Sequence, residues 1–503
     1  MNSPAGKPRL TGELALAVSR SCFGTMNVPV ILRQLTTVVG SAYLCRAINL
    51  VISLILLRRW DLAQLGEFYT IVGYWNTCTI LSDLGLGRIL VARLQQAPER
   101  SSYLISQGML IRAATSLAAY AFTVGLAWLI APSFQVRWWT TVYLLGIPFF
   151  NLRTVIHPLL QVNRQFGVIA GMDLAMSVAH LGVVWWFLAT LDIGTFLGVM
   201  MATNAATAVY ALWFVRRSGF AWTGAWEWKP LRELFMAGVP LGLSGICHMA
   251  YYHIDLLVVS AFWGNREAGI LGIAKRLLDL GIILADSVML VALPGLAKAW
   301  RKGNEALDGV AAGTFRLMGG LLLPAIGAML LFPDVLLDLL ARQSIPEAPP
   351  VIALSTMFLI GVSYGVIQSN LLVVVGRNWM DPLFLGSLAA VSITLNLVVV
   401  PLWASMGAAI TMCVIKVIYF VAALNVGLTR PWISGYLRTV GLPWAVALAC
   451  GGLARAFLPT PLIAFLAFLA ASGLVGWIGF GLGRVSAVME PGGEAVSDAG
   501  RKA

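Results

Sequence analysis

The sequence has few charged residues. Asp, Glu, Lys and Arg together make up 11% of its 503 residues, whereas 59% of the residues are hydrophobic. Soluble proteins carry roughly 25% charged residues, so this composition excludes a soluble globular chain. The scarcity of charge indicates a membrane protein throughout its length.

Cysteine pairs and long polar connections are also missing. None of the six cysteines forms a CxxC pair, which argues against a disulfide framework or a zinc site. The N-terminus has no cleavable signal pattern. The longest connection between apolar segments runs from residue 293 to 316, so we expect no soluble domain.

Long apolar segments fill most of the chain, and a membrane-spanning helix needs about 20 such residues. We therefore expect an all-α, polytopic membrane protein with about 14 transmembrane helices, at residues 36–57, 67–88, 111–131, 139–161, 168–190, 193–215, 235–262, 268–293, 316–333, 351–375, 382–402, 406–428, 438–457 and 461–483. Residues 1–35 form an N-terminal surface segment in this prediction, with 10–23 as a helix on the membrane surface or as a disordered tether. Residues 484–503 are predicted to be a disordered tail.

The net charge of +12 follows the predicted topology. Of the 34 Lys and Arg residues, 29 lie outside the spans or at their ends, including Arg112 at the start of its span. With the N-terminus inside, 23 of these fall on the cytoplasmic side and 6 on the outer side. Because positive residues stay cytoplasmic, both termini are predicted to be cytoplasmic. The excess of basic over acidic residues is therefore no indication of nucleic-acid binding.

Residues 234–286 concentrate ionisable side chains in two apolar spans that are joined by the polar turn WGNRE. Charges at bilayer depth are rare unless they face a protein interior or a wet cavity. By their spacing, two groups of three polar residues each share a helix face: His248, Tyr252 and Asp255, and then Lys275, Asp279 and Asp286. The pattern predicts a polar path through the membrane protein.

Further ionisable residues lie in the first half of the chain. Arg46 shares a face of the first span with Asn49 and has no acidic residue within one helical turn. Asp83 ends the second span just before Gly85, either as part of a gate or as an interfacial carboxylate paired with Arg88 or Arg93.

Two neighbouring spans carry ionisable residues that can satisfy one another. Arg153 and His157 lie on the fourth span and Asp173 on the fifth. Asp173 is therefore predicted to pair with Arg153 or His157.

The two halves of the chain repeat each other. A shift of 203 residues matches Trp60 with Trp263, Gly66 with Gly269 and Asp83 with Asp286. Six spans per repeat is an even number, which predicts parallel repeats about an axis along the membrane normal. We expect an N-lobe at 36–215, a C-lobe at 235–428 and two additional peripheral helices at 438–483.

Three stretches carry a family resemblance. The runs LLRRWDLAQLGEFYTI and LSDLGLGRILVARL resemble the opening hairpin of polysaccharide and oligosaccharide flippases (Wzx-like) of the multidrug/oligosaccharidyl-lipid/polysaccharide (MOP) exporter superfamily. Residues 236–280 resemble their seventh and eighth helices, and LNLVVVPLWASMGAAIT resembles the turn between the eleventh and twelfth. Together the resemblance covers residues 31–430.

The resemblance implies two six-helix lobes in a V around a central cavity that helices 1, 2, 7 and 8 line. It implies a flippase of the bacterial inner membrane that moves a polyprenyl-diphosphate-linked oligosaccharide outward by alternating access, not an enzyme. A lipid II-type flippase and a cation-coupled drug exporter of the same superfamily are alternatives. A membrane glycosyltransferase or polymerase would need acidic catalytic loops, and the outer loops here are short. A structural scaffold would leave the intramembrane charges unexplained.

The candidate site residues fall into three groups. Cations for the diphosphate and polar or aromatic groups for the sugars are expected at Arg46, Asn49, Lys275, Arg276, Tyr252 and His248. An inner gate is expected at Asp83 and Asp286, and a coupling cation, Na⁺ or H⁺, at Asp255 with Asn396 and Thr411. No other cofactor and no metal are expected. The expected partners are the lipid-linked glycan, membrane lipids, a polysaccharide polymerase and glycosyltransferases.

Overall fold

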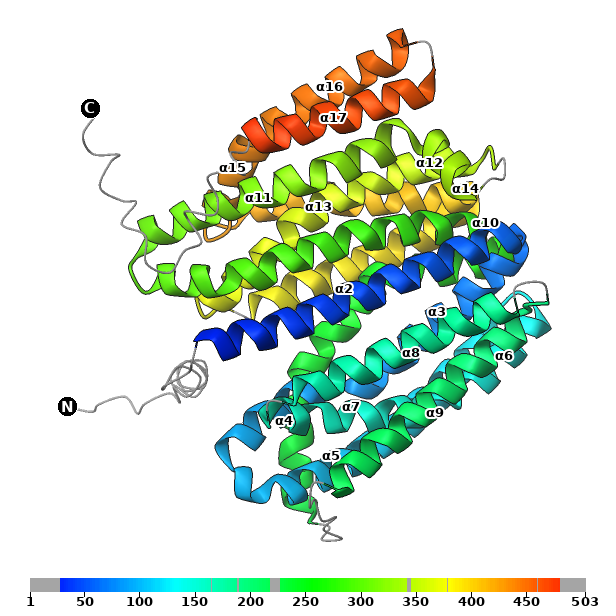
Figure 1. The fold of residues 1–503 in the computed structure, drawn as a ribbon, viewed down its shortest axis with the longest axis vertical. Coiled ribbons are helices and arrows are strands. Elements are labelled where there is room, and N and C mark those ends of the chain that lie inside the picture. The colour runs from blue at the N-terminus through cyan, green and yellow to red at the C-terminus, as the bar shows by residue number, and fades with distance from the viewer. Residues whose placement is uncertain are drawn as a thin grey trace. The chain divides into compact units, whose positions relative to one another are not determined.

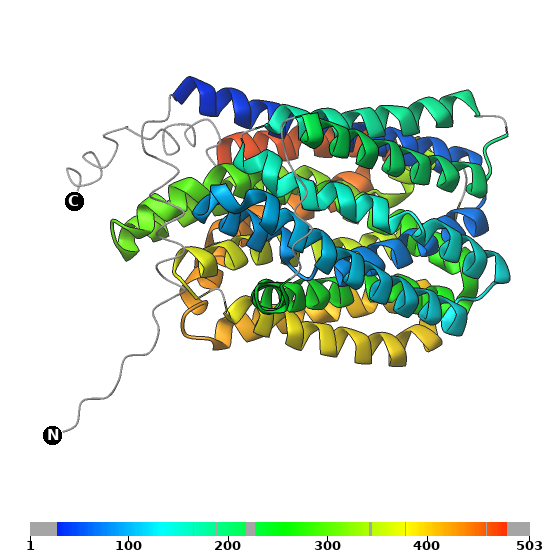
Figure 2. The same cartoon turned by 90° about the horizontal axis from the view of Figure 1, so that it is seen from below.

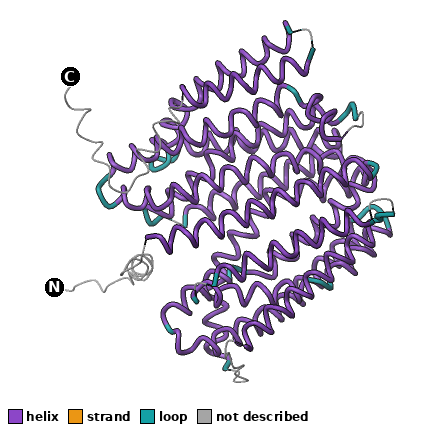
Figure 3. The backbone as a smooth tube through the Cα atoms, viewed as in Figure 1, coloured by secondary structure: helices purple, strands orange, loops and turns teal. Residues whose placement is uncertain are grey.

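The computed structural model describes residues 28–163, 165–187, 190–217, 227–341, 345–377, 379–458 and 460–479. Within these ranges the chain is helical and has no strand (Figure 3), which confirms the predicted all-α class. Eight of the described helices are long and apolar enough to cross a membrane by length and composition. The number of fourteen spans therefore stays a prediction. The predicted segments 10–23 and 484–503 lie outside the described residues.

The chain divides into two compact units, and the first is a helical bundle. Unit 1 comprises the described residues up to Ile55 together with Tyr74–Leu129 and Arg137–Ile246. Its helices are α2 (Val28–Arg59), α3 (Leu62–Asp83), α4 (Leu86–Gln96), the turn η1 (Pro98–Arg100), α5 (Ser101–Ile130), α6 (Phe134–Leu144), α7 (Ile147–Val162), α8 (Phe166–Trp186), α9 (Ile193–Arg217) and the first part of α10 (Trp228–Trp300).

Apolar residues of consecutive segments form the core of unit 1. Leu90 of α4, Ile105 of α5 and Ile156 of α7 are fully buried in one cluster. Helices α7 and α8 both pack on α9, and α8 and α9 lie side by side (Figure 1, Figure 2). The burial of these apolar faces stabilises the bundle.

Two predicted spans of unit 1 are each interrupted. Helix α3 ends at Asp83 and α4 begins at Leu86, because Leu84 and Gly85 adopt left-handed φ angles of 42° and 70°. Glycines at 85 and 87 allow a bend or a close helix approach, and the break falls at Leu84 and Gly85. The predicted span 139–161 is also divided, between α6 and α7, but without a left-handed residue, since Gly146 there has a φ of −72°.

Unit 2 comprises Leu56–Gly73, Ile130–Val136 and the described residues from Cys247 onward. Its helices are the remainder of α10, α11 (Asn304–Leu331), α12 (Pro333–Ala341), α13 (Ala348–Val374), α14 (Met380–Asn425), α15 (Arg430–Tyr436), the π-helical turn η2 (Leu437–Gly441), α16 (Leu442–Phe457) and α17 (Pro461–Gly479), together with parts of α2 and α3. Helix α11 packs against α13, α16 and α17 (Figure 1). The two predicted additional helices thus belong to unit 2.

Two long helices of unit 2 each contain a reversal where the sequence predicts a turn. Helix α10 is interrupted at Gly264, whose φ of 79° and ψ of −170° favour glycine. This residue lies in the predicted turn WGNRE. Helix α14 is interrupted at Trp403 and Ala404, within the run LNLVVVPLWASMGAAIT that resembles a turn between two helices of the family.

Candidate functional site

Arg46 lies on an exposed face of α2 in unit 1. Asn49 follows nearly one helical turn later and is also exposed, so both side chains share that face. Arg46 forms no ion pair with any residue that the structure describes. Of the cations predicted inside spans, it is thus one whose guanidinium is free to bind an anion.

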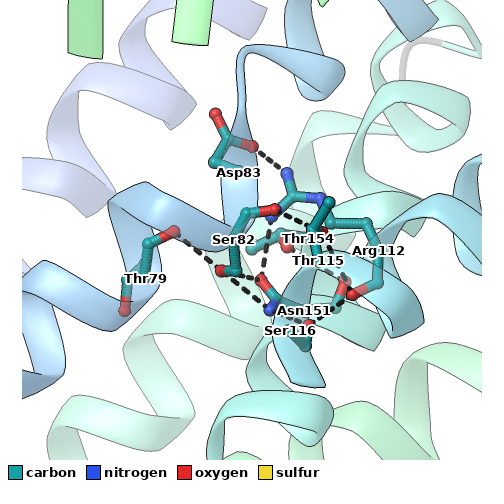
Figure 4. Close-up of polar contacts among 8 residues, drawn as sticks. All are labelled: Thr79, Ser82, Asp83, Arg112, Thr115, Ser116, Asn151 and Thr154. Atoms are coloured by element: carbon teal, nitrogen blue, oxygen red, sulfur yellow. Dashed lines mark hydrogen bonds and ion pairs between the residues drawn. The ribbon is translucent and has the colours of Figure 1, made fainter. Parts of the chain in front are cut away.

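The carboxylate of Asp83 binds the guanidinium of Arg112 in unit 1. Arg112 Nη2 donates a hydrogen bond to Asp83 Oδ1, which places this ion pair at the break between α3 and α4 (Figure 4). The Arg112 side chain is buried, whereas that of Asp83 is 44% exposed. The partner of Asp83 is therefore Arg112 of α5, which the sequence prediction did not name.

Arg112 also anchors a network of buried polar residues. Its Nη1 donates to Asn151 Oδ1 of α7 at 2.8 Å, and Asn151 Nδ2 donates to Ser82 Oγ at 3.0 Å and to Ser116 Oγ at 2.6 Å (Figure 4). Thr115 Oγ1 donates to the carbonyl oxygen of Ser82 at 2.8 Å. The network ties α3, α5 and α7 together where α3 ends.

The predicted span that carries Arg112 starts at residue 111, and the structure extends this helix toward the N-terminus. Helix α5 begins at Ser101, three turns before Arg112, and only 4% of Arg112 is exposed. A signal was present, because Asp83 near the end of one span and Arg112 near the start of the next lie at the same depth.

The predicted pairing of Asp173 with Arg153 is confirmed. Arg153 Nη1 of α7 donates to Asp173 Oδ1 of α8 at 2.9 Å. Because Arg153 is buried and already carries this partner, it serves the packing of unit 1.

In unit 2 the two polar stripes of α10 meet. Lys275 Nζ lies 2.5 Å from Asp255 Oδ1 and also donates to the carbonyl oxygen of Tyr252. Both charged side chains are buried, and the ammonium lies 4.6 Å from the centre of the Tyr252 ring. The structure thus brings together Lys275, Asp255 and Tyr252, which the sequence assigned to two different roles.

A second ion pair lies beside the first and is half-exposed. Arg276 Nη1 lies 3.6 Å from Asp279 Oδ2, with both side chains more than one third exposed. Tyr252 Oη donates to Asp279 Oδ1 at 2.7 Å. Tyr252 therefore contacts the buried pair with its ring and the exposed pair with its hydroxyl.

Two other predicted site residues of α10, His248 and Asp286, are exposed. The His248 ring stacks on the Tyr252 ring at 6.3 Å between centroids, and the residue as a whole is exposed. Asp286 is exposed on the second part of α10.

The predicted cation-site residues do not all come into contact. Asn396 Nδ2 donates to the Ser392 carbonyl oxygen at 2.9 Å on its own helix, while Asp255 is bound by Lys275. Asn396 Oδ1 and Thr411 Oγ1 are buried without a hydrogen-bond partner among the described residues. The two lie on opposite sides of the break in α14.

Lys416 of α14 lies in an aromatic box. Its Nζ lies 4.3 Å from the ring centre of Phe358, 4.6 Å from that of Tyr251 and 5.5 Å from that of Tyr419. The side chain is buried, and Gly361 makes room for its stem. Cation–π contacts stabilise the ammonium here, and no carboxylate of the described residues forms an ion pair with it.

Comparisons with known proteins give a family and a fold. A family model described as polysaccharide biosynthesis protein matches residues 64–344. An uncharacterized membrane protein of Methanocaldococcus jannaschii is 26% identical over 187 residues, 36% of this chain and 36% of that protein, so the match spans only about a third of that protein's length.

Two solved structures share the fold at low identity. The lipid II flippase MurJ, in an inward closed conformation, has a TM-score of 0.73 at 12% identity and matches 89% of this chain and 98% of that chain. An inward-facing MATE family multidrug resistance transporter of the MOP superfamily has a TM-score of 0.61 at 13% identity, over 85% of this chain and 99% of that chain. The helical architecture is therefore the one seen in this superfamily.

Proposed function

Because this chain belongs to the family of polysaccharide biosynthesis proteins, we propose that it is a flippase. It moves a polyprenyl-diphosphate-linked oligosaccharide from the cytoplasmic to the outer leaflet of the bacterial inner membrane by alternating access. The glycan supplies a cell-surface polysaccharide such as O-antigen, capsule or exopolysaccharide. Glycosyltransferases then act before this step and a polymerase after it. Translocation forms and breaks no covalent bond, so the protein is a transporter and needs no catalytic residue.

The observation that carries the proposal is the exposed guanidinium of Arg46. A cation within a spanning helix costs several kcal/mol unless it has water or a partner. The described residues supply no carboxylate to Arg46, and Asn49 beside it offers further hydrogen bonds. A diphosphate suits this face, because guanidinium binds phosphate oxygens in a bidentate manner.

Arg276 is the second cation that suits the substrate, in preference to Lys275. The donors of Lys275 are taken by Asp255 and by the backbone of Tyr252, and its side chain is buried. Arg276 and Asp279 are half-exposed at 3.6 Å, a separation at which phosphate oxygens can replace the carboxylate. We assign Lys275 and Tyr252 to holding this surface in place and Arg276 to the diphosphate.

The exposed ring of His248 provides a surface for sugars. Its stacking on Tyr252 fixes the ring plane, so that a pyranose face can pack on it. His248 and Arg276 flank Tyr252 on the same half-exposed part of unit 2, which places sugar and diphosphate contacts near each other.

Asp83 and Asp286 are proposed to act at the inner gate. Asp83 keeps its pair with Arg112, so its half-exposed carboxylate is presented at a fixed place on unit 1. Asp83→Asn and Asp286→Asn should each shift the resting population toward the inward-open state. Double electron–electron resonance across the cytoplasmic ends measures this shift, and unchanged distance distributions in both variants would remove the gate role.

The test of the proposed function is glycan export in cells that lack their own flippase. The wild-type chain should restore surface glycan. Arg46→Ala should lower export at least about tenfold at normal protein abundance, because one charge-assisted contact contributes about 1.5–3 kcal/mol. Arg46→Lys should retain part of the activity, and Arg46→Glu none.

The control variant is Arg59→Ala, which removes an exposed arginine from the end of the same helix. It should export normally. Full activity of Arg46→Ala at normal abundance would exclude Arg46 from the binding site and leave Arg276 as the candidate.

A lipid II-type flippase is the second candidate, favoured by the fold shared with MurJ. Depletion of the host lipid II flippase separates the two functions. Growth rescue by this chain would support the second candidate, and restored surface glycan without rescue would support the first.

A further inference from the structure

A transporter that is coupled to an alkali cation needs a carboxylate that can bind the cation. The sequence places this role on Asp255, together with Asn396 and Thr411. The two neutral residues each keep a buried oxygen without a hydrogen-bond partner in the described part of the chain. Any metal ion at the predicted site would therefore need the Asp255 carboxylate as its charged ligand.

The Asp255 carboxylate already has a cation. Asp255 Oδ1 accepts hydrogen bonds from Lys275 Nζ at 2.5 Å and from the backbone nitrogen of Leu256 at 2.7 Å. Only 4% of the Asp255 side chain is exposed. A second positive charge at this carboxylate would meet repulsion from the ammonium at close range, so the residues as they stand do not fit a metal ion.

The ammonium of Lys275 is held on three sides. It binds the Asp255 carboxylate, the carbonyl oxygen of Tyr252 and the face of the Tyr252 ring. A carboxylate, a backbone carbonyl and an aromatic face are ligands that also suit a monovalent cation. Lys275 carries the same single charge as an alkali ion and is attached to the chain.

The pair is also local in sequence. Asp255 and Lys275 are 20 residues apart in α10, on either side of the reversal at Gly264. The reversal therefore brings the lysine back to the carboxylate within one helical hairpin. No contact from another helix is needed to form the pair.

On the basis of the transport function proposed above, we propose that Lys275 is the built-in cation of the Asp255 site and excludes Na⁺ from it. A sodium gradient then does not drive transport through Na⁺ binding at Asp255. Removal of the ammonium should convert the position into a site that takes an alkali ion, with the Asp255 carboxylate as the charged ligand and the carbonyl oxygen of Tyr252 as a neutral one.

The test is the thermal unfolding of the purified full-length protein in NaCl, LiCl, KCl or N-methyl-D-glucamine chloride at equal ionic strength. The Tm of the wild type should be the same in all four salts. Lys275→Ala should have a lower Tm that rises saturably with Na⁺ or Li⁺ by about 2 °C or more, because a ligand that binds only the folded state stabilises it. Lys275→Ala combined with Asp255→Asn should lose this response.

Two further variants complete the experiment. Lys275→Gln keeps an apolar stem with an uncharged polar end, and it should show the same cation response if Lys275→Ala does not fold. Lys229→Ala removes an exposed lysine of the same helix and should behave as the wild type.

A saturable response of the wild type to Na⁺ that Asp255→Asn abolishes would overturn the proposal. A folded Lys275 variant that no alkali ion stabilises would also overturn it. Neither measurement involves glycan export, so a failure here is distinguishable from a failure of the proposed function.

Discussion

The backbones of Gly66 and Gly269 lie against each other in unit 2. A Cβ on Gly66 would lie 1.6 Å from the carbonyl oxygen of Asn265, and a Cβ on Gly269 would lie 2.2 Å from that of Leu62. The two glycines are also the matched pair of the sequence repeat. Equivalent positions of the two halves thus meet where α3 begins and where the second part of α10 begins.

Alanine at either glycine should destabilise the protein. The added Cβ forces backbone displacement, and such overpacking typically costs about 1–3 kcal/mol, occasionally more. Gly66→Ala and Gly269→Ala should therefore lower Tm in thermal unfolding of the purified protein. Gly125→Ala is the control, since open space surrounds Gly125 on α5. Equal Tm values for all three variants would contradict this close contact.

Loss of the Asp83 carboxylate should destabilise the protein strongly, although Asp83 itself is half-exposed. Asp83→Asn leaves the buried guanidinium of Arg112 without its carboxylate, and an uncompensated buried charge costs about 3–5 kcal/mol. Denaturant unfolding in detergent measures the cost, with the exposed Arg93→Ala as the control, which should cost little. Equal stability of Asp83→Asn and the control would show that the buried guanidinium does not depend on Asp83.

The orientation of the chain can be measured by single-cysteine labelling. The excess of positive residues predicts cytoplasmic termini, with Gln135 outside and Gly303 inside. In a cysteine-free background, a membrane-impermeant thiol reagent added to intact cells should label Gln135→Cys and not Gly303→Cys. Labelling after cell lysis shows that both thiols are reactive. The reverse pattern would invert the proposed direction of transport.

Stability should depend weakly on pH through Glu347. Arg266 Nη2 lies 2.9 Å from Glu347 Oε1, and this hydrogen bond holds the pKa of Glu347 below its usual value. A carboxyl with a lowered folded pKa stabilises the protein above its unfolded pKa, near 4.5, and this contribution is lost as the pH falls through the folded pKa.

The matched measurement is the difference in Tm between wild type and Glu347→Gln across pH. It should be small and constant near neutral pH, because both side chains are largely exposed, and should shrink below pH 4.5. The control Glu305→Gln removes an exposed carboxylate that forms no ion pair with the described residues, and it should show no corresponding change. A difference that grows toward low pH would contradict the assigned pair.

Hydropathy predicted the helical class and most helix positions, because the membrane requires long apolar segments. Polar residues and a glycine in the turn WGNRE also indicated the reversal at Gly264. The early start of α11 at Asn304 and the short helix α12 were not predicted. These segments are polar or short, so no requirement of the bilayer marks them in the sequence.

The candidate site was harder to predict than the fold. Spacing along one helix placed Tyr252 and Asp255 on one face, and the structure keeps them together around Lys275. Pairing between helices depends on their relative rotation as well as on depth, and one sequence does not contain the rotation. For this reason Arg112 was missed as the partner of Asp83.

The ion pairs of α10 and of the first spans have a consequence for biosynthesis in the membrane. Each pair joins two predicted spans that follow one another in the chain: Asp83 with Arg112, Arg153 with Asp173, and Asp255 with Lys275. A helix that leaves the translocon alone with one of these charges exposes it to lipid at a cost of several kcal/mol. Two successive helices that leave together carry the pair already neutralised. The order of charges along the chain therefore favours insertion hairpin by hairpin, with each hairpin balanced in charge before the next one leaves the ribosome.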